Sequence, residues 1–190
     1  MYRSVLVAIL VSLVAGCVSM PAQKYQPGIA STQELMKTGR SKMAVDRFDA
    51  SKGVDNSSLD IRGSQLTGAG DGSFSTYLHD ALQSELEAAG RYDPAATARL
   101  SGTLTVNDLE SGVSVGKARV GARFVLTRQH AIVFDKVLTA DHQWDSSFVG
   151  AIAIPAAMQN YTTAVQKLAE ALFSDPDFVK ANQEDVPASH

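Results

Sequence analysis

The sequence contains a single cysteine, Cys17, among 190 residues. A disulfide within the chain is therefore excluded, and an apolar core has to stabilise the fold. Positive charge is also scarce, because 17 Lys and Arg residues stand against 20 Asp and Glu residues and give a net charge of −3. Binding to a phosphate backbone needs clustered Lys and Arg, so we expect no nucleic-acid partner.

The sequence also lacks a long apolar run. The longest one, residues 5–14, has about ten residues, whereas a helix needs about 20 to cross a bilayer. This run follows one positive charge, Arg3, and precedes the small residues Ala15 and Gly16. A short apolar stretch between a basic start and small residues is typical of a secretory signal, so we expect residues 1–16 to be removed on export.

The end of this signal carries a more specific pattern. The motif Leu13-Val14-Ala15-Gly16-Cys17 resembles the lipobox of bacterial lipoprotein precursors. The resemblance implies cleavage before Cys17, a diacylglyceryl thioether on its sulfur and acylation of the new N-terminus, and two or more acyl chains anchor a protein stably to a membrane. Val18 stands where an Asp would resemble an inner-membrane retention signal, which implies the outer membrane with the domain facing the periplasm. The alternative is an ordinary secretory signal with an incidental cysteine.

Composition divides the rest of the chain into three parts. Residues 17–41, with the lipidated cysteine at their start, are rich in Pro, Gly and polar residues, which predicts a flexible tether. Residues 42–178 carry the periodic apolar patterns of a folded α+β domain, and residues 179–190 form a polar C-terminal tail.

The patterns inside the domain predict its fold class. Apolar and polar residues alternate in residues 43–48, 99–109, 117–127 and 131–144, which predicts strands, although Lys136 and His142 on the apolar side of the last one indicate a bulge or a sheet edge. Apolar residues recur every three or four positions from Ser73 to Gly90 and from Pro155 to Phe173, which predicts helices. The order β-α-β-β-β-α predicts a two-layer α+β sandwich, with two helices on one face of a mainly antiparallel sheet of about four strands.

We find no motif for catalysis, a metal or a cofactor, and we expect a protein that is not an enzyme. The segment from Gly112 to Lys117 does not match a phosphate-binding loop. That motif has four residues between its two glycines and a Ser or Thr after its lysine, whereas this segment has three residues between the glycines and is followed by Ala118. We therefore predict a hairpin turn. Glycines in residues 68–72 precede a helix but match no dinucleotide fingerprint. The four histidines are not spaced as metal ligands, and no serine lies in a G-x-S-x-G elbow.

Residues 144–155 form the most unusual segment. Their Gly, Ser and Pro content predicts a loop, yet most of them are apolar. Loops lie on the surface, so exposed apolar side chains there mark a contact with a partner or a lipid. We therefore predict a contact site at Phe148 and Ile152. The alternative is that Phe148, Ile152 and Ile154 plug the end of the core.

The domain patterns also resemble a family layout. They are Tyr77-Leu78-x-x-Ala81-Leu82-x-x-Glu85-Leu86, Leu100-Ser101-Gly102-Thr103-Leu104 and Val165-x-x-Leu168-Ala169-x-x-Leu172. This layout is similar to the periplasmic domains of small outer-membrane lipoproteins, namely the auxiliary lipoproteins of ABC-type transport systems and the YajG-like lipoproteins. The resemblance implies an accessory or scaffold role in a cell-envelope complex, with an unidentified protein partner. The alternative is a module that binds a small ligand or lipid in an apolar cleft between helices and sheet.

Overall fold

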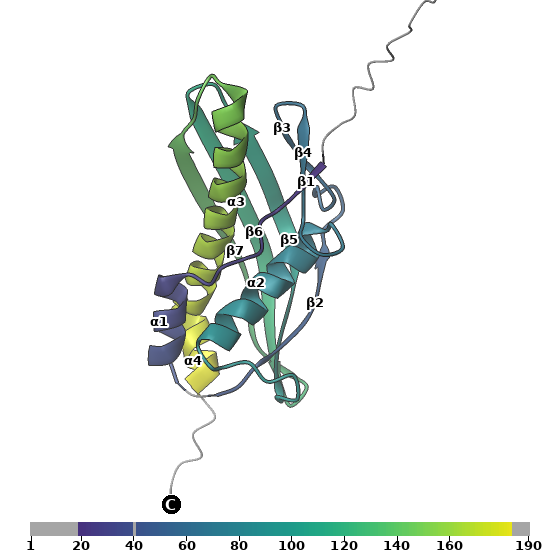
Figure 1. Ribbon diagram of the computed structural model, residues 1–190. Coiled ribbons are helices and arrows are strands. Elements are labelled where there is room, and N and C mark those ends of the chain that lie inside the picture. The colour runs from purple at the N-terminus through teal and green to yellow at the C-terminus, as the bar shows by residue number, and fades with distance from the viewer. Residues whose placement is uncertain (1–18, 40, 184–190) are drawn as a thin grey trace, which may run out of the picture.

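A computed structural model describes residues 19–39 and 41–183 (Figure 1). Along the chain, the helices and strands are β1 (Ser19–Pro21), α1 (Ile29–Lys37), β2 (Ala44–Ala50), β3 (Leu59–Ile61), β4 (Ser64–Thr67), α2 (Phe74–Ala88), β5 (Ala98–Ser111), β6 (Val115–Arg128), β7 (Ala131–Asp145), α3 (Gly150–Phe173) and α4 (Pro176–Gln183). None of these helices is long and apolar enough to cross a membrane.

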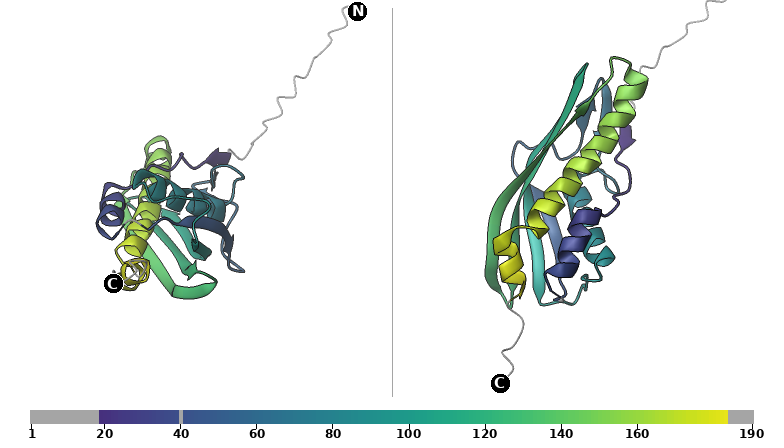
Figure 2. Two further views of the ribbon diagram at one scale, coloured as in Figure 1. Left: turned by 90° about the horizontal axis from the view of Figure 1, so that it is seen from below. Right: turned by 90° about the vertical axis from the view of Figure 1, so that its left-hand side faces the viewer.

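A four-stranded sheet in the order β2-β5-β6-β7 forms the centre of the fold. Strands β5, β6 and β7 pair antiparallel as a meander, and β2 pairs parallel with β5. Helices α2 and α3 lie against one face of this sheet and leave the other face uncovered (Figure 2). The α+β class and the antiparallel meander are therefore confirmed.

The fold has more parts than the predicted sandwich of about four strands and two helices. A second sheet of three strands has the order β1-β4-β3. The sequence carries only a weak strand signal at residues 59–62, where β3 lies, and one short helical turn at residues 32–37, within α1; β1, β4 and α4 were not predicted. Strands β1 and β3 have three residues each and α1 has nine, which is too short for a clear apolar period.

Local chemistry explains the boundaries of α2. The Ser73 hydroxyl accepts a hydrogen bond from the Thr76 N–H at 3.2 Å, as an N-cap does. At the other end Gly90 has a φ of 66°, a left-handed conformation that is open to glycine and ends the helix. Both boundaries were predicted from the sequence.

Helix α3 begins earlier than predicted. It starts at Gly150, so Pro155 lies inside the helix and not in its first turn. Pro155 has no N–H to offer the Ala151 carbonyl, but this costs a single hydrogen bond close to the helix end. The preceding residues form helix because the Ile152 and Ala153 N–H groups donate to the Val149 carbonyl and Ala153 is fully buried.

Two strands contain bulges that shift the predicted faces. The register between β2 and β5 shifts after Val45, so Phe48 is buried and Arg47 is exposed. The register between β6 and β7 shifts near Ile132, which turns this residue outward. The edge predicted from Lys136 and His142 is confirmed, because β7 is the last strand of its sheet.

Residues 19–39 do not have the structure of a flexible tether. Strand β1 pairs with β4, Tyr25 and Leu35 are buried in the core, and α1 packs against α2 and α3. The Glu85 carboxylate, on α2, accepts hydrogen bonds from the Tyr25 hydroxyl at 2.6 Å and from the Gly28 N–H at 2.8 Å. Composition failed here because the partners lie more than 50 residues away in the sequence.

The C-terminal boundary also moves. Helix α4 runs to Gln183, beyond the predicted start of a polar tail at residue 179, and its Phe178 and Ala181 side chains are buried. Asp175 holds the start of this helix, because its carboxylate accepts hydrogen bonds from the Asp177 and Phe178 N–H groups. The rest of the predicted tail lies outside the described residues.

Candidate functional site

Four exposed apolar side chains gather at one end of the molecule, where the turn between β5 and β6 meets the connection from β7 to α3. They are Val113, Phe148, Val149 and Ile152, and we call this group the tip. The Ser146 N–H donates to the Ser114 carbonyl at 2.8 Å and joins the two segments. Eight large apolar side chains are exposed among the described residues, and the tip contains half of them. This clustering makes the tip the candidate site.

Arg62 holds the backbone beneath the tip. It lies in the two-residue turn between β3 and β4, where Arg62 and Gly63 have φ values of 54° and 83°, as a tight hairpin requires. Its guanidinium donates hydrogen bonds to the carbonyls of Ser111 at 3.2 Å, Gly112 at 2.6 Å and Phe148 at 3.0 Å. One side chain therefore ties three segments together.

The two predicted contact residues both point to solvent. Phe148 is 81% exposed and Ile152 is 60% exposed, so neither plugs the core. The alternative holds for Ile154 alone, which is half-buried against the core. The exposure agrees with a contact role for Phe148 and Ile152, and that role stays a prediction.

The sequence did not identify Val113, Val149 or Arg62 as parts of this site. A valine between Gly112 and Ser114, in a predicted hairpin turn, was a usable signal because turns favour polar residues. Nothing in the sequence around Arg62 indicated which carbonyls it would meet, since they lie about 50 and 86 residues further along the chain.

The tip carries no charged side chain of its own. The sequence has no Asp, Glu, Lys or Arg between Asp145 and Lys167, or between Glu110 and Lys117. Exposed helical and turn segments of this length normally carry charge, so an uncharged end with outward apolar side chains is suited to an apolar neighbour.

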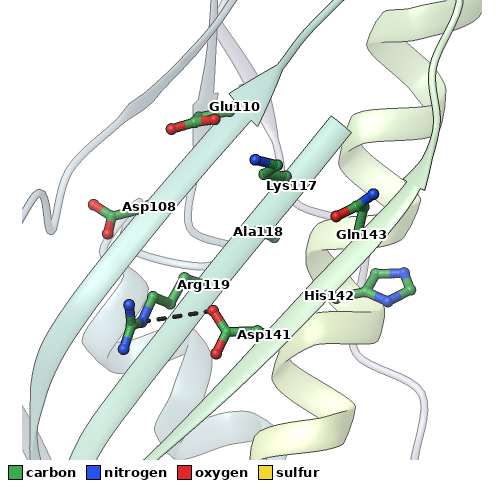
Figure 3. A pocket seen from close by; sticks show the side chains of 8 residues that line it. All are labelled: Asp108, Glu110, Lys117, Ala118, Arg119, Asp141, His142 and Gln143. Carbon is green, nitrogen blue, oxygen red and sulfur yellow. Dashed lines mark ion pairs between the residues drawn. The ribbon is translucent and has the colours of Figure 1, made fainter. Parts of the chain in front are cut away.

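Figure 3 shows a second candidate, a depression of about 460 Å³ on the uncovered face of the sheet. The polar side chains at its wall are Asp108, Glu110, Lys117, Arg119, Asp141 and Gln143. Arg119 lies directly between Asp108 and Asp141 in the strand register, with 3.6 Å from its Nε to the Asp141 Oδ1. Opposite charges across neighbouring strands stabilise a sheet. This arrangement is that of a solvated sheet face.

A stronger charge pair lies further along the same face. The Arg123 Nε donates to the Asp135 Oδ1 at 2.7 Å, and a second guanidinium nitrogen contacts the other carboxylate oxygen. These hydrogen bonds from Arg123 hold the pKa of Asp135 below its ordinary value. The uncovered face therefore carries exposed ion pairs between neighbouring strands, as a solvated sheet face does.

Two of the four histidines, His79 and His142, form side-chain hydrogen bonds. His142 bridges β7 to α3, with its Nε2 at 2.7 Å from the Asn160 Oδ1 and its Nδ1 at 3.0 Å from the Lys167 Nζ. His79 contacts the neighbouring Asp80 at 2.8 Å. Within residues 19–39 and 41–183, no three His, Cys, Asp or Glu side chains are grouped so that they could bind a metal ion.

Cys17, the predicted lipidation site, lies outside the described residues. The described chain begins two residues later, at Ser19, the first residue of β1. Strand β1 runs parallel to β4, with Ser19 opposite Gln65, and β4 follows the turn that contains Arg62. The start of β1 is therefore directed toward the end of the molecule that carries the tip.

Comparisons with known proteins give a fold and no family. No family model and no curated protein sequence matches the chain. The chain is similar to the solved structure of a Xanthomonas campestris protein of family DUF330, with a TM-score of 0.56 and 16% identity, over 82% of this chain and 95% of that one. It is also similar to a Caulobacter crescentus protein described provisionally as a lipoprotein, with a TM-score of 0.46 and 14% identity, over 79% of this chain and 93% of that one. At 16% identity, the likeness to the Xanthomonas campestris protein shows a shared fold alone.

Proposed function

We propose that this chain is a lipoprotein, anchored through acyl chains on Cys17 to the periplasmic side of the outer membrane, where its domain acts as an accessory or scaffold component of an envelope assembly or transport complex. The role is one of binding, with no reaction assigned to the chain. The resemblance to ABC-type auxiliary and YajG-like lipoproteins supports this role as an analogy of layout.

The observation that carries the proposal is the position of the first strand. The lipobox motif ends at Cys17, and β1, the first described strand, begins at Ser19. Two residues span at most about 7 Å, so acyl chains on Cys17 would hold the domain directly at the bilayer. An anchor this close gives the domain a fixed end and leaves the uncovered sheet face free for a protein partner.

The alternative function, a ligand or lipid held between helices and sheet, has less support. The space between α2, α3 and the sheet is filled by large side chains that are fully buried, among them Tyr77, Phe124 and Tyr161. The Tyr161 hydroxyl donates to the Asn107 Oδ1 at 2.7 Å inside this core. A ligand there would have to displace packed side chains, so we favour the accessory role.

Fractionation of the full-length chain from a Gram-negative host tests the anchor. We expect the wild-type protein in the outer membrane, with the mass of a triacylated N-terminal cysteine, and a Cys17→Ser variant in the soluble fraction. Val18→Asp is the matched variant that keeps the lipobox, and it should move the protein to the inner membrane. An unmodified sulfur, or a Cys17→Ser variant that stays with membranes, would contradict the proposal.

Crosslinking in intact cells tests the accessory role. A photoreactive side chain at Val137, on the uncovered sheet face, should give one crosslinked species of discrete mass with an envelope protein. The same group at Met36, on α1 and exposed to a similar extent, serves as the control and should not. The role is contradicted if Val137 gives no such species, or if Val137 and Met36 give the same products.

A further inference from the structure

We propose that the tip contacts the surface of the bilayer that holds the anchor, with Phe148 and Ile152 among the lipid headgroups and upper acyl chains. This inference rests on the lipid anchor proposed above. It adds a second attachment, made by the folded domain, which would fix the orientation of the domain on the membrane.

The geometry places the anchor and the tip at the same end. Ser19 pairs with Gln65, three residues from Arg62, and Arg62 donates to the Phe148 carbonyl. Helix α3 begins at this end, whereas α1 and α4 lie at the opposite one (Figure 1). Since Cys17 is at most about 7 Å from Ser19, acyl chains on its sulfur enter the bilayer beside the tip.

The chemistry of the tip fits a lipid surface. Its four apolar side chains come from the turn between β5 and β6, from the connection after β7 and from the first turn of α3, and each is more than half exposed. Burying such side chains at the boundary between headgroups and acyl chains strengthens the binding of an interfacial segment to a membrane. The four tip residues carry no charge, and the one guanidinium beneath them, that of Arg62, is bonded to backbone carbonyls, so contact should depend little on anionic lipid.

The backbone at the tip is already fixed by hydrogen bonds before any contact with lipid. Arg62 and the hydrogen bond between Ser146 and Ser114 hold both segments in place. Because the backbone of both segments is already ordered, binding to the bilayer causes a smaller loss of conformational entropy than binding by a flexible loop would.

Chemical labelling of the lipidated protein in vesicles tests the proposal. Acylation leaves Cys17 unreactive, so Ile152→Cys introduces a single free thiol. Met36→Cys is the matched control, because Met36 and Ile152 are both 60% exposed and lie at opposite ends. Each variant is reconstituted at low density in phosphatidylcholine vesicles and alkylated with a membrane-impermeant maleimide. For comparison, Ile152→Cys and Met36→Cys are each also combined with Cys17→Ser, which removes the anchor and gives the soluble background.

We expect alkylation at position 152 to be at least about tenfold slower on vesicles than in the soluble background, with no change at position 36. Adding Phe148→Ser should restore part of the rate, and anionic lipid should leave it unchanged. Equal rates at position 152 in both backgrounds would overturn the proposal. So would slowing at both positions, or slowing that grows with protein density, which identifies a second copy as the cover.

The two proposals fail in different ways. If mass spectrometry finds no lipid on Cys17, the anchor fails before the tip is examined. If Cys17 carries lipid and position 152 reacts as it does in water, the anchor stands and the bilayer contact of the tip is refuted.

Discussion

An arginine holds the backbone of both the N-terminal segment and the tip, but only the N-terminal segment also places large apolar side chains in the core. Arg91 donates to the carbonyls of Leu35, Gly39 and Ser41, just as Arg62 donates to three carbonyls beneath the tip. In the N-terminal segment, Tyr25 and Leu35 point into the core, whereas at the tip Phe148 and Ile152 point to solvent.

This difference shows that a segment can have a fixed backbone while its apolar side chains remain exposed. Apolar exposure on a loose loop is easily explained by motion, but the tip backbone is tied by a guanidinium in the same way as a segment that is buried in the core. The exposure therefore belongs to the folded state. A fold that orders apolar side chains and leaves them outside is suited to a partner that is not part of the chain.

The largest effect is expected from removing the arginine under the N-terminal segment. Arg91 is 3% exposed, and burial lowers its pKa. Arg91→Ala leaves three carbonyls without their donor, one of them in the last turn of α1, and should lower the free energy of unfolding by about 3 kcal/mol. Urea denaturation measures this loss. Met36→Ala, on the exposed side of α1, is the control and should change it by less than about 0.5 kcal/mol; equal effects would show that the segment is not held by Arg91.

A smaller effect is expected from the corresponding change at the tip. Arg62 contacts its carbonyls from the surface, where water can replace a lost donor, so Arg62→Ala should lower the free energy of unfolding by about 1 kcal/mol. The loss should be local, with faster hydrogen exchange at the Ser146 amide. Arg47→Ala, which removes another exposed arginine side chain, is the control. Unchanged exchange at Ser146 in the Arg62→Ala variant would contradict the role assigned to Arg62.

These two arginines also show what the sequence could and could not predict. The meander, α2 and its caps follow from periods and residue types within a few positions of one another, so β5, β6, β7 and both ends of α2 were predicted. The order of residues 19–39 depends on contacts from Glu85 and Arg91, which lie more than 50 residues away. A composition rich in Pro and Gly indicates a tether unless those partners are known.

The candidate site also has one part that the sequence indicated and another that it did not. The apolar content of residues 144–155 left two interpretations open, a surface contact at Phe148 and Ile152 or a plug of the core, and only the structure shows that both side chains are exposed. The helical start at Gly150 and the addition of Val113 were not predictable, because they depend on how the hairpin and the loop meet in space. Periodicity describes one element at a time and cannot show which elements end side by side.

A third charged residue, Asp175, extends the comparison to α4 and gives a pH dependence. Burial raises the pKa of Asp175, but hydrogen bonds from Lys136 and from the Phe178 and Asp177 N–H groups outweigh burial and bring it below 3.8. Its contribution to stability is therefore present above about pH 3.8 and is lost as the pH falls through its lower folded-state pKa.

An Asp175→Asn variant isolates this contribution from those of the other carboxylates. At neutral pH the variant should be modestly less stable than the wild type, and the two should converge as the pH falls below 3.8. Chemical denaturation at a series of pH values measures the difference. A difference that stays constant down to the lowest pH would show that the charge of Asp175 does not hold α4.

The smallest effect on stability is expected at the tip side chains themselves, and it is the sharpest test of the comparison. Phe148→Ser removes a large apolar side chain that is 81% exposed, so the free energy of unfolding should change by less than about 0.5 kcal/mol. Phe48→Ser, at a position that is 3% exposed, should lower it by about 3 kcal/mol or more. If Phe148→Ser were as damaging as Phe48→Ser, the tip would be part of the core, and its exposure could no longer indicate an outside partner.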